Sequence, residues 1–561
     1  MFDDRRGQLA TWMVALLVGS PLPAAAQTAP PGAGTILQEL KPLEPPAPSS
    51  VEPGLTIPQQ PKASLPPTSP FPVKVIHISG NTAFDTPTLH ALIAAAEGKE
   101  LTLSELNAFV SRITDYYHAH GYPLTRAIVP AQTIRDGVVA VEVIEARYDK
   151  IILDNKSRVS DALLQSTLSP LKSGQLIEQP NLEHALLLLS DIPGVVQSAT
   201  LKPGEATGTS DLLVQASRGP LAAGVVTGDN YGNTYTGQAR GGGEVALYDP
   251  LRHGDVLDAN VVTSGKDMAY GRISYDCLLN GLGTHLGGSY SALHYTLGGA
   301  LASLEGSGTA QVASLWLRQP LVRTSDVNLY GQLQFDRKDL RDAIDVSATH
   351  TDRHLDNWTA SLSGDWRDPW FSGGTNSWSA QWVRGTVEFD NAVAEAADAA
   401  TAKTQGPFSQ WDATLARLQR LGTLSVLYVA LSGQWASGNL DPSQKMVAGG
   451  RYTVRSYDMS ALSGDTGVQG TVEYRRDLGR TWHAQWQALV FLDAQHVMIN
   501  KDPWTSGKND ATLRGAGVGL SWINTHQWSA KAYVAARLGA APELARSTAP
   551  VHAWLEISKG F

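Results

Sequence analysis

Two residues in the C-terminal half have the types and the spacing to form a fixed ion pair. Arg455 lies in a glycine-rich loop between Gly449–Gly450 and Ser463–Asp465, and Asp493 ends an alternating run over 483–493. In that run Asp493 falls on the polar side of the predicted strand. A planar guanidinium can donate two parallel hydrogen bonds to one carboxylate. We therefore expect Arg455 to bind Asp493; the alternative is a solvated Arg455 without a fixed partner, as surface charges usually are.

Other patterns that could support catalysis or metal binding are weak. The run Gly515–Gly519 has neither a phosphate-binding lysine nor a strand-to-helix setting, which favours a glycine-rich strand. The histidines lack the spacing to carboxylates or cysteines that a zinc site requires, and Cys277 is the single cysteine. We predict no catalytic residue, metal ion or cofactor, although a hidden active site stays an alternative.

Residues 219–561 have the alternation of membrane β-strands. Apolar and polar side chains alternate in 327–336 and in 528–538, and every tryptophan except Trp12 lies at or beyond Trp316. Barrels need such aromatic residues for their interfacial girdles. No long uncharged apolar run follows the N-terminus, so no transmembrane helix is predicted. The pattern predicts an antiparallel transmembrane β-barrel, and a soluble sandwich or propeller is the alternative.

A barrel of this length has room for a wet lumen, where polar side chains on the inner face stay solvated. The alternation over 483–493 then directs Asp493 into that lumen. Arg455 becomes a candidate partner inside the barrel.

The N-terminal segments are predicted to serve export and spacing. Residues 1–26 combine a basic start, an apolar run and a small-residue cleavage site, as a signal peptide does. A membrane anchor is disfavoured because the apolar run is short. One or two helical turns are expected at 35–40, within 27–41. Residues 42–72 contain eleven prolines and predict an extended tether without a core of its own.

Residues 73–147 and 148–218 repeat one order of elements: strand, helix, helix, strand, strand. Four helices are expected, at 86–96, 102–120, 161–168 and 181–190. Asp136–Gly137 predicts a hairpin turn in the first copy. Small α+β modules of this kind expose a strand edge that can pair with an extended peptide.

The candidate site residues carry a family resemblance. Val454-Arg455-Ser456-Tyr457 is similar to the VRGY loop motif of two-partner secretion outer-membrane transporters, the TpsB family of haemolysin activators, with serine in place of glycine. Phe491-Leu492-Asp493 resembles the F-x-D-x-G strand motif of the same family, with Gln495 at the position of the glycine. If the loop position of Ser456 needed a positive φ, serine would cost on the order of 1 kcal/mol there.

Three further segments resemble the same family. Two of them are similar to signatures of a second POTRA domain and one to the first barrel strand: Asp191–Gly194, Leu201–Gly204 and Asp229–Arg240. The resemblance therefore covers the mature chain from the repeated modules to the barrel.

The resemblance implies a mainly β architecture with a 16-stranded antiparallel barrel at 219–561. It implies POTRA domains at 73–147 and 148–218, a linker at 42–72 and a plug helix within 27–41. The POTRA domains would lie in the periplasm and bind the N-terminal secretion domain of a haemolysin-like or adhesin-like exoprotein. The barrel, in outer-membrane lipid, would translocate that partner, and the loop carrying Arg455 would reach into the lumen to Asp493.

Two other functions stay open beside export. An outer-membrane protein insertase of the same superfamily is one, and a passive porin is the other; an enzyme is a more distant alternative. Two modules and a proline-rich tether favour export over insertion, and a porin has no need for two peptide-binding modules. The formal net charge of −9 argues against a nucleic-acid partner.

Overall fold

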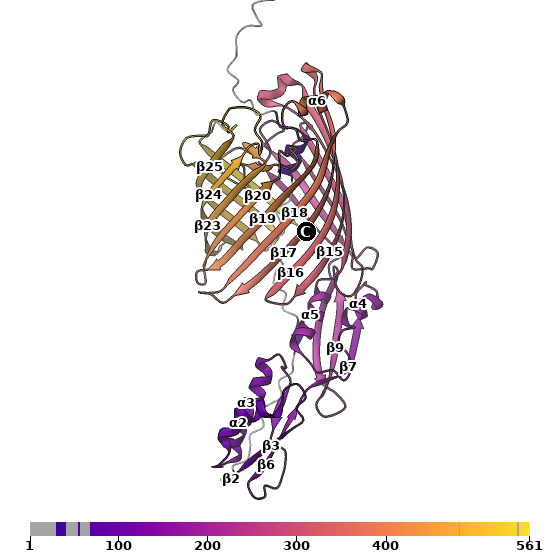
Figure 1. Cartoon of the computed structure of the whole chain (residues 1–561), viewed down its shortest axis with the longest axis vertical. Helices are drawn as coiled ribbons and strands as arrows, with labels where there is room; N and C mark the ends of the chain where they lie inside the picture. The colour runs from indigo at the N-terminus through magenta and orange to yellow at the C-terminus, as the bar shows by residue number, and fades with distance from the viewer. Residues whose placement is uncertain (1–29, 41–53, 57–67, 482, 547–548) are drawn as a thin grey trace, which may run out of the picture.

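The computed structural model describes residues 30–40, 54–56, 68–481, 483–546 and 549–561. The chain forms a closed β-barrel with two α+β units below it, and a short helix lies inside the barrel near the opposite end (Figure 1). The predicted signal peptide at 1–26 and most of the proline-rich segment lie outside the described residues.

The barrel consists of sixteen antiparallel strands, each hydrogen-bonded to its neighbours, and β10 closes it against β27. This confirms the predicted fold class. The strands are β10 (Ala222–Asp229), β11 (Arg240–Tyr248), β12 (Val256–Thr263), β13 (Met268–Leu278), β14 (His285–Thr296), β15 (Gly306–Arg323), β16 (Val327–Ile344), β17 (Thr349–Asp368), β18 (Gly374–Phe389), β19 (Gly406–Arg420), β20 (Ser425–Ala436), β23 (Thr466–Thr481), β24 (Ala484–Met498), β25 (Asp510–Asn524), β26 (Trp528–Arg537) and β27 (Val551–Gly560).

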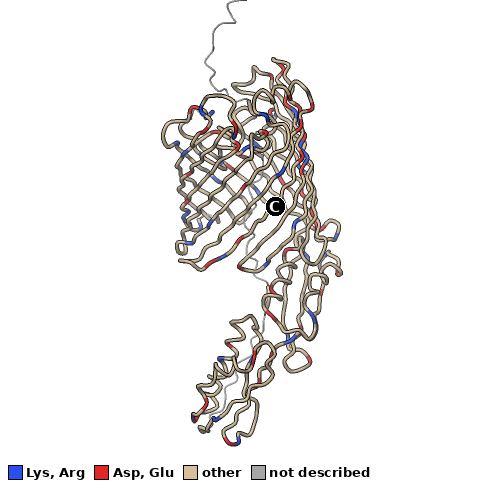
Figure 2. The backbone as a smooth tube through the Cα atoms, in the orientation of Figure 1, with Lys and Arg blue, Asp and Glu red and all other residues tan. Residues whose placement is uncertain are grey.

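The barrel strands alternate between an apolar outer face and a lumen face. In β24, Val490 and Leu492 are 51% and 56% exposed on the outside, whereas Phe491 and Asp493 are each 3% exposed. Charged residues lie along several barrel strands as well as in the loops and in the two α+β units (Figure 2). Among the described residues, no helix is both long and apolar enough to cross a membrane. The parity predicted for Asp493 is therefore the observed one.

The first α+β unit, residues 71–146, packs two helices on a small sheet. Its elements are β2 (Phe71–Val73), β3 (Val75–Ser79), α2 (Thr86–Ile93), η1 (Ala94–Ala96), β4 (Lys99–Leu101), α3 (Leu103–Ala119), β5 (Arg126–Ile128) and β6 (Val138–Ile144). Thr102 and Glu105 form a capping box that starts α3. The predicted helix at 86–96 ends earlier than expected, and its last turn is a 3₁₀ helix.

The second α+β unit, residues 147–218, repeats this arrangement with β7 (Arg147–Asn155), α4 (Asp161–Leu168), α5 (Gln179–Ser190), β8 (Val195–Pro203) and β9 (Thr209–Arg218). A short strand from the proline-rich segment, β1 (Leu55–Thr56), pairs with the edge of β8. Ala199 N–H donates to Gly54 O at 2.9 Å, and Leu55 packs against the core of this unit. The tether was predicted to be extended and without a core of its own; its pairing with β8 was not predicted and is possible because β8 offers a free edge.

A buried carboxylate connects the two units. Glu145 accepts hydrogen bonds from the backbone N–H groups of Thr82 and Ala83 and from the hydroxyls of Thr82 and Tyr117. Burial raises the pKa of Glu145, but these hydrogen bonds outweigh it and leave the pKa below the ordinary value. Arg147, the first residue of the second unit, donates to Thr82 Oγ1 at 2.9 Å.

The remaining elements lie inside the barrel or in its loops. Helix α1 (Ala33–Glu39) overlaps the helix predicted at 35–40 and packs against β14, β15 and β16. The other elements are η2 (Gly299–Leu304), η3 (Asp345–Ser347), α6 (Ala392–Ala399), β21 (Met446–Ala448) and β22 (Leu462–Gly464). Strands β21 and β22 pair antiparallel and enclose residues 449–461, called the lumen loop below.

Candidate functional site

The lumen loop begins at two glycines whose backbone excludes other residues. Gly449 and Gly450 have φ of +92° and +108°, which L side chains rarely adopt. A Cβ at Gly449 would meet Asp458 O at 2.6 Å, and one at Gly450 would meet Met459 Sδ at 2.1 Å. The chain can therefore fold back on itself here and carry Arg455 to the wall.

The structure brings Arg455 and Asp493 together as a two-pronged ion pair. Arg455 Nε donates to Asp493 Oδ2 at 2.8 Å and Nη2 donates to Oδ1 at 2.7 Å. The backbone N–H of Arg455 also donates to Oδ2, at 3.1 Å. Arg455 is 3% exposed. Asp493 therefore fixes both the side chain and the backbone of the loop tip.

Sequence reasoning missed a second carboxylate at this site. Arg455 Nη1 donates to Glu473 Oε1 at 2.6 Å, and Arg475 donates to the other oxygen, Oε2. Thr471 Oγ1 accepts from Arg455 Nη2 and donates to Asp493 Oδ1 at 2.7 Å. The signal was present, because residues 471, 473 and 475 alternate with the apolar Val472 and Tyr474, as lumen-facing residues of a strand do.

Aromatic and aliphatic side chains surround the buried charges. The guanidinium of Arg455 lies over the Phe491 ring, 3.4 Å from its centroid, which favours a cation over a π face. Trp554 Nε1 donates to Arg455 O at 2.7 Å. On either side of Arg455 and Ser456, Val454 and Tyr457 are buried in one apolar cluster with loop and wall residues. The loop tip is thus held by packing as well as by charge.

The two departures from the family motifs have local structural explanations. Ser456 is fully buried and does not have a positive φ, so the expected conformational cost does not apply. Its side chain fills the space over Gly515, where an added Cβ would lie 2.1 Å from Ser456 Oγ. Gln495 Nε2 donates to Val447 O at 2.9 Å and so fastens β21 to the wall.

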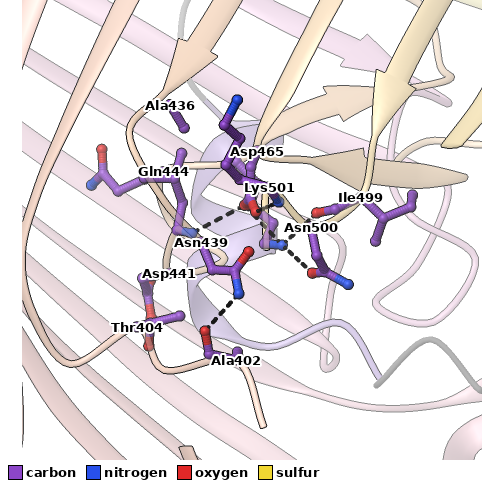
Figure 3. A network of polar contacts seen from close by, with 12 residues as sticks. Ala402, Thr404, Ala436, Asn439, Asp441, Gln444, Asp465, Ile499, Asn500 and Lys501 are labelled. Atoms are coloured by element: carbon purple, nitrogen blue, oxygen red, sulfur yellow. Dashed lines mark hydrogen bonds and ion pairs between the residues drawn. The ribbon is translucent and has the colours of Figure 1, made fainter. Parts of the chain in front are cut away.

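A second polar network secures the base of the lumen loop. Asp465, fully buried, accepts from the N–H groups of Leu440 at 3.1 Å and Lys501 at 2.8 Å, and pairs with Lys445 Nζ at 2.9 Å. Figure 3 shows Asp465 among residues that belong to three separate loops. The sequence marked Asp465 as part of the loop pattern, but not these partners, because they come from the loops after β20 and β24.

Helix α1 is held by residues of the wall and of the loop after β20. The N–H of Ala33 donates to Asp342 Oδ1 at 2.7 Å, and Asn233 Nδ2 donates to Glu39 Oε1 at 2.9 Å. Gly34 lies against Ser443, where an added Cβ would approach Ser443 N to 2.7 Å. The helix therefore occupies the lumen next to the network of Asp465 (Figure 3).

A third arginine connects the wall to the loop that covers α1. Arg353 Nη1 donates to Asp342 Oδ2 at 2.9 Å, and Arg353 Nε donates to Asp441. The side chains of Arg353, Asp342 and Asp441 lie at or near the lumen, and their contacts were not predicted from the sequence. Within the described ranges, no group of three or more His, Cys, Asp or Glu side chains is arranged to hold a metal ion.

These contacts hold the lumen loop and α1 inside the barrel. Fold and site define a transmembrane β-barrel whose lumen contains an N-terminal helix and an inserted loop. Residues 71–146 match the ShlB-type POTRA domain. Residues 208–522 match the family described as haemolysin secretion/activation protein ShlB/FhaC/HecB, and the chain belongs to that family.

Two named relatives align over most of the chain. The heme/hemopexin transporter protein HuxB of Haemophilus influenzae (strain 86-028NP) is 26% identical over 473 residues, 83% of either chain. The outer membrane transporter CdiB of Escherichia coli is 24% identical over 488 residues, which cover 84% of this chain and 80% of CdiB. The family resemblance noted in the sequence is confirmed.

Solved structures share the fold. CdiB from Escherichia coli has a TM-score of 0.69 at 18% identity and covers 91% of this chain and 94% of its own. BamA from Haemophilus ducreyi lacking POTRA domains 1–3 has a TM-score of 0.50 at 13% identity, with 88% and 100% covered. The family places the barrel in the outer membrane and the POTRA region in the periplasm, as predicted.

Proposed function

We propose that this protein is an outer-membrane transporter that exports a partner protein by two-partner secretion. The observation that carries the proposal is a 16-stranded barrel whose lumen holds α1 and the lumen loop through side-chain contacts. Segments held in this way can move without unfolding the wall, whose strands pair along their length. Members of the family are transporters, and we infer no enzymatic activity for this chain.

The division of the chain follows from this function. We assign a signal peptide to 1–26, a plug to 27–41, a linker to 42–72, two POTRA domains to 73–147 and 148–218, and the barrel to 219–561. Support comes from α1 in the lumen, from the match of the first unit to a POTRA domain, and from the same element order in the second unit.

The cargo is inferred to be an exoprotein whose N-terminal secretion domain binds the POTRA domains. The relatives named above are a heme/hemopexin transporter protein and an outer membrane transporter. Strand β5 in the first unit and strand β7 in the second are edge strands, each paired with a neighbouring strand on one side only. An extended segment of the cargo can add to such an edge through main-chain hydrogen bonds.

Arg455 and Asp493 are proposed to hold the lumen loop in the resting pore. Val454, Ser456 and Tyr457 shape the loop tip, and Phe491 supports the guanidinium. Moving Arg455 away would leave Asp493 buried without its cation and Glu473 with Arg475 alone, which is unfavourable. The resting position of the loop is therefore well defined, and transport requires its release and return.

The test is export of a candidate partner, an exoprotein with an N-terminal secretion domain that is co-expressed with this transporter. Wild-type transporter is expected to release it into the medium, and Arg455→Ala and Asp493→Ala are expected to abolish release while the barrel inserts normally. Heat-modifiable migration on a gel checks insertion. Normal export by both variants would show that the pair has no role in transport.

The same strains separate export from the two rival functions. An insertase would lower the amounts of other outer-membrane proteins when it is depleted, whereas an exporter would leave them unchanged. A passive porin would support solute uptake in the absence of any exoprotein. Loss of the partner from the medium as the sole defect supports export.

A further inference from the structure

The second α+β unit does not hang freely below the barrel. Leu278, the last residue of β13, is buried in the hydrophobic core of that unit. Gly281, in the turn that follows, lies so close to α4 that an added Cβ would be 2.3 Å from Ser166 O. Two other periplasmic turns, at 249–255 and 324–326, also contact the unit. The barrel and the second unit therefore share one packed interface.

One ion pair crosses this interface. Arg323, at the end of β15, donates from Nε to Asp191 Oδ2 at 2.7 Å and from Nη2 to Asp191 Oδ1 at 2.8 Å. Arg323 is 3% exposed, and its Nη1 donates to Asn328 Oδ1 at 2.9 Å. Asn328 in turn donates to Asp365 on β17. The barrel wall thus holds the guanidinium in place to receive Asp191.

The segment Asp191–Gly194, which stops α5, meets the barrel at three of its four positions. Asp191 binds Arg323, and Ile192 lies against Gly254, where an added Cβ would approach Ile192 Cγ2 to 2.7 Å. Gly194 O accepts from Gly219 N–H at 2.8 Å. The export function proposed above gives this segment no role, although its contacts are directed at the barrel.

We propose that Asp191–Gly194 is a docking motif and that Arg323 is its receptor, a positioning residue for transport. The pair holds the second unit at one place beneath the barrel, so that cargo bound there is presented to the pore entrance. This inference rests on the proposed export function. It assigns Arg323 no contact with the cargo.

Hydrogen exchange of the full-length transporter in detergent or vesicles tests docking without any cargo. Arg323→Ala is expected to speed exchange of the turn amides at 279–284 by about tenfold, as the loss of charge-assisted hydrogen bonds to a buried arginine implies. Asp191→Ala is expected to match it. The double variant is expected to add nothing further, because both substitutions remove the same interaction.

A steric wedge provides an independent perturbation. Gly281→Ala forces a Cβ into the α4 backbone and is expected to increase exchange in the same turn without touching the ion pair. Gly271→Ala, in β13, has nothing within 4 Å of the added Cβ and is the matched control. Unchanged exchange in Arg323→Ala, or additive effects of Asp191→Ala and Arg323→Ala, would overturn the docking proposal.

Transport measurements complete the test. In Arg323→Ala and Gly281→Ala, binding of the purified secretion domain is expected to stay at the wild-type level while export falls. Export at the wild-type level despite lost turn protection would refute a positioning role. If the wild-type protein exports no partner while turn protection responds as expected, the proposed function fails and the docking stands.

Discussion

Two segments occupy the lumen of this barrel, and they are held in different ways. The lumen loop is fixed at Arg455 by a two-pronged ion pair, a second carboxylate and an apolar cluster. Helix α1 has seven residues; Ala33 and Ile36 pack in an apolar cluster with wall residues, and its polar neighbours are Asp342, Asn233 and Ser443. The loop is part of a continuous chain between two barrel strands, whereas α1 is followed by a proline-rich segment.

We call the lumen loop, which the Arg455 ion pair holds in place, the latch, and helix α1 the stopper. Two polar contacts of α1 join a neutral N–H donor to a carboxylate, at Asp342 and at Glu39. Such a hydrogen bond contributes about 1.5–3 kcal/mol, whereas removing one partner of a buried ion pair costs about 3–5 kcal/mol. We therefore expect α1 to leave the lumen more readily than the loop tip leaves Asp493. The loops after β20 and β24 join the two, since Asp465 binds Leu440 and Lys501 beside the residues that contact α1.

The largest effect is expected from Arg455→Ala. The substitution leaves Asp493 buried without a cation and Glu473 paired with Arg475 alone, which costs about 3–5 kcal/mol by analogy with other buried pairs. Hydrogen exchange of the lumen loop amides measures the loss. Arg337→Ala is the control. The Arg337 side chain is 46% exposed and pairs with Asp339 and Asp356, and exposed pairs of this kind contribute about 0–1 kcal/mol to stability. Equal exchange in the two variants would contradict a latch at Arg455.

A leak through the pore is expected from Gly34→Val. The added side chain cannot fit against the Ser443 backbone, so α1 leaves its seat while the Arg455 pair stays intact. Single-channel conductance in planar bilayers is expected to rise above that of the wild-type protein. Thr35→Ala, on the same helix, is the matched control and should leave conductance unchanged. An unchanged conductance in Gly34→Val would mean that α1 does not block the pore.

The sequence predicted the Arg455–Asp493 contact of the latch but not the partners of the stopper, and the reason is physical. Strand parity assigns each side chain to a face, so Asp493 could be placed in the lumen and matched with a loop arginine. The same rule places Glu473 on the lumen face of its strand, where it binds Arg455. The partners of α1, Asp342 and Ser443, come from segments hundreds of residues away, and no local pattern pairs them with the helix.

The short strand β1 shows a different limit. Proline content predicts an extended chain, but an extended chain with free backbone groups can add to any open edge. Whether Leu55–Thr56 pairs with β8 depends on where the edge lies in the folded protein. The contacts of the turns at 249–255 and 279–284 with the second unit cannot be predicted from the sequence for the same reason.

A moderate effect is expected from Glu473→Gln. The amide oxygen can still accept from Arg455, and Asp493 keeps its two contacts, but the charge shared with Arg475 is lost. Hydrogen bonds to charged groups contribute about 1.5–3 kcal/mol each, so exchange of the lumen loop should rise less than in Arg455→Ala. Export is expected to be reduced but measurable. Complete loss of export would show that Glu473 carries as much of the latch as Asp493.

The smallest effect is expected from Ser456→Gly, which restores the residue of the family motif. If Ser456 were strained, glycine would stabilise the loop; its φ is not positive, so no strain is relieved. Glycine removes the side chain that fills the space over Gly515 and adds backbone freedom, a loss of about 0.5–1 kcal/mol. Lumen loop exchange should therefore rise slightly. A slower exchange would mean that Ser456 destabilises the loop because its side chain packs too tightly against Gly515.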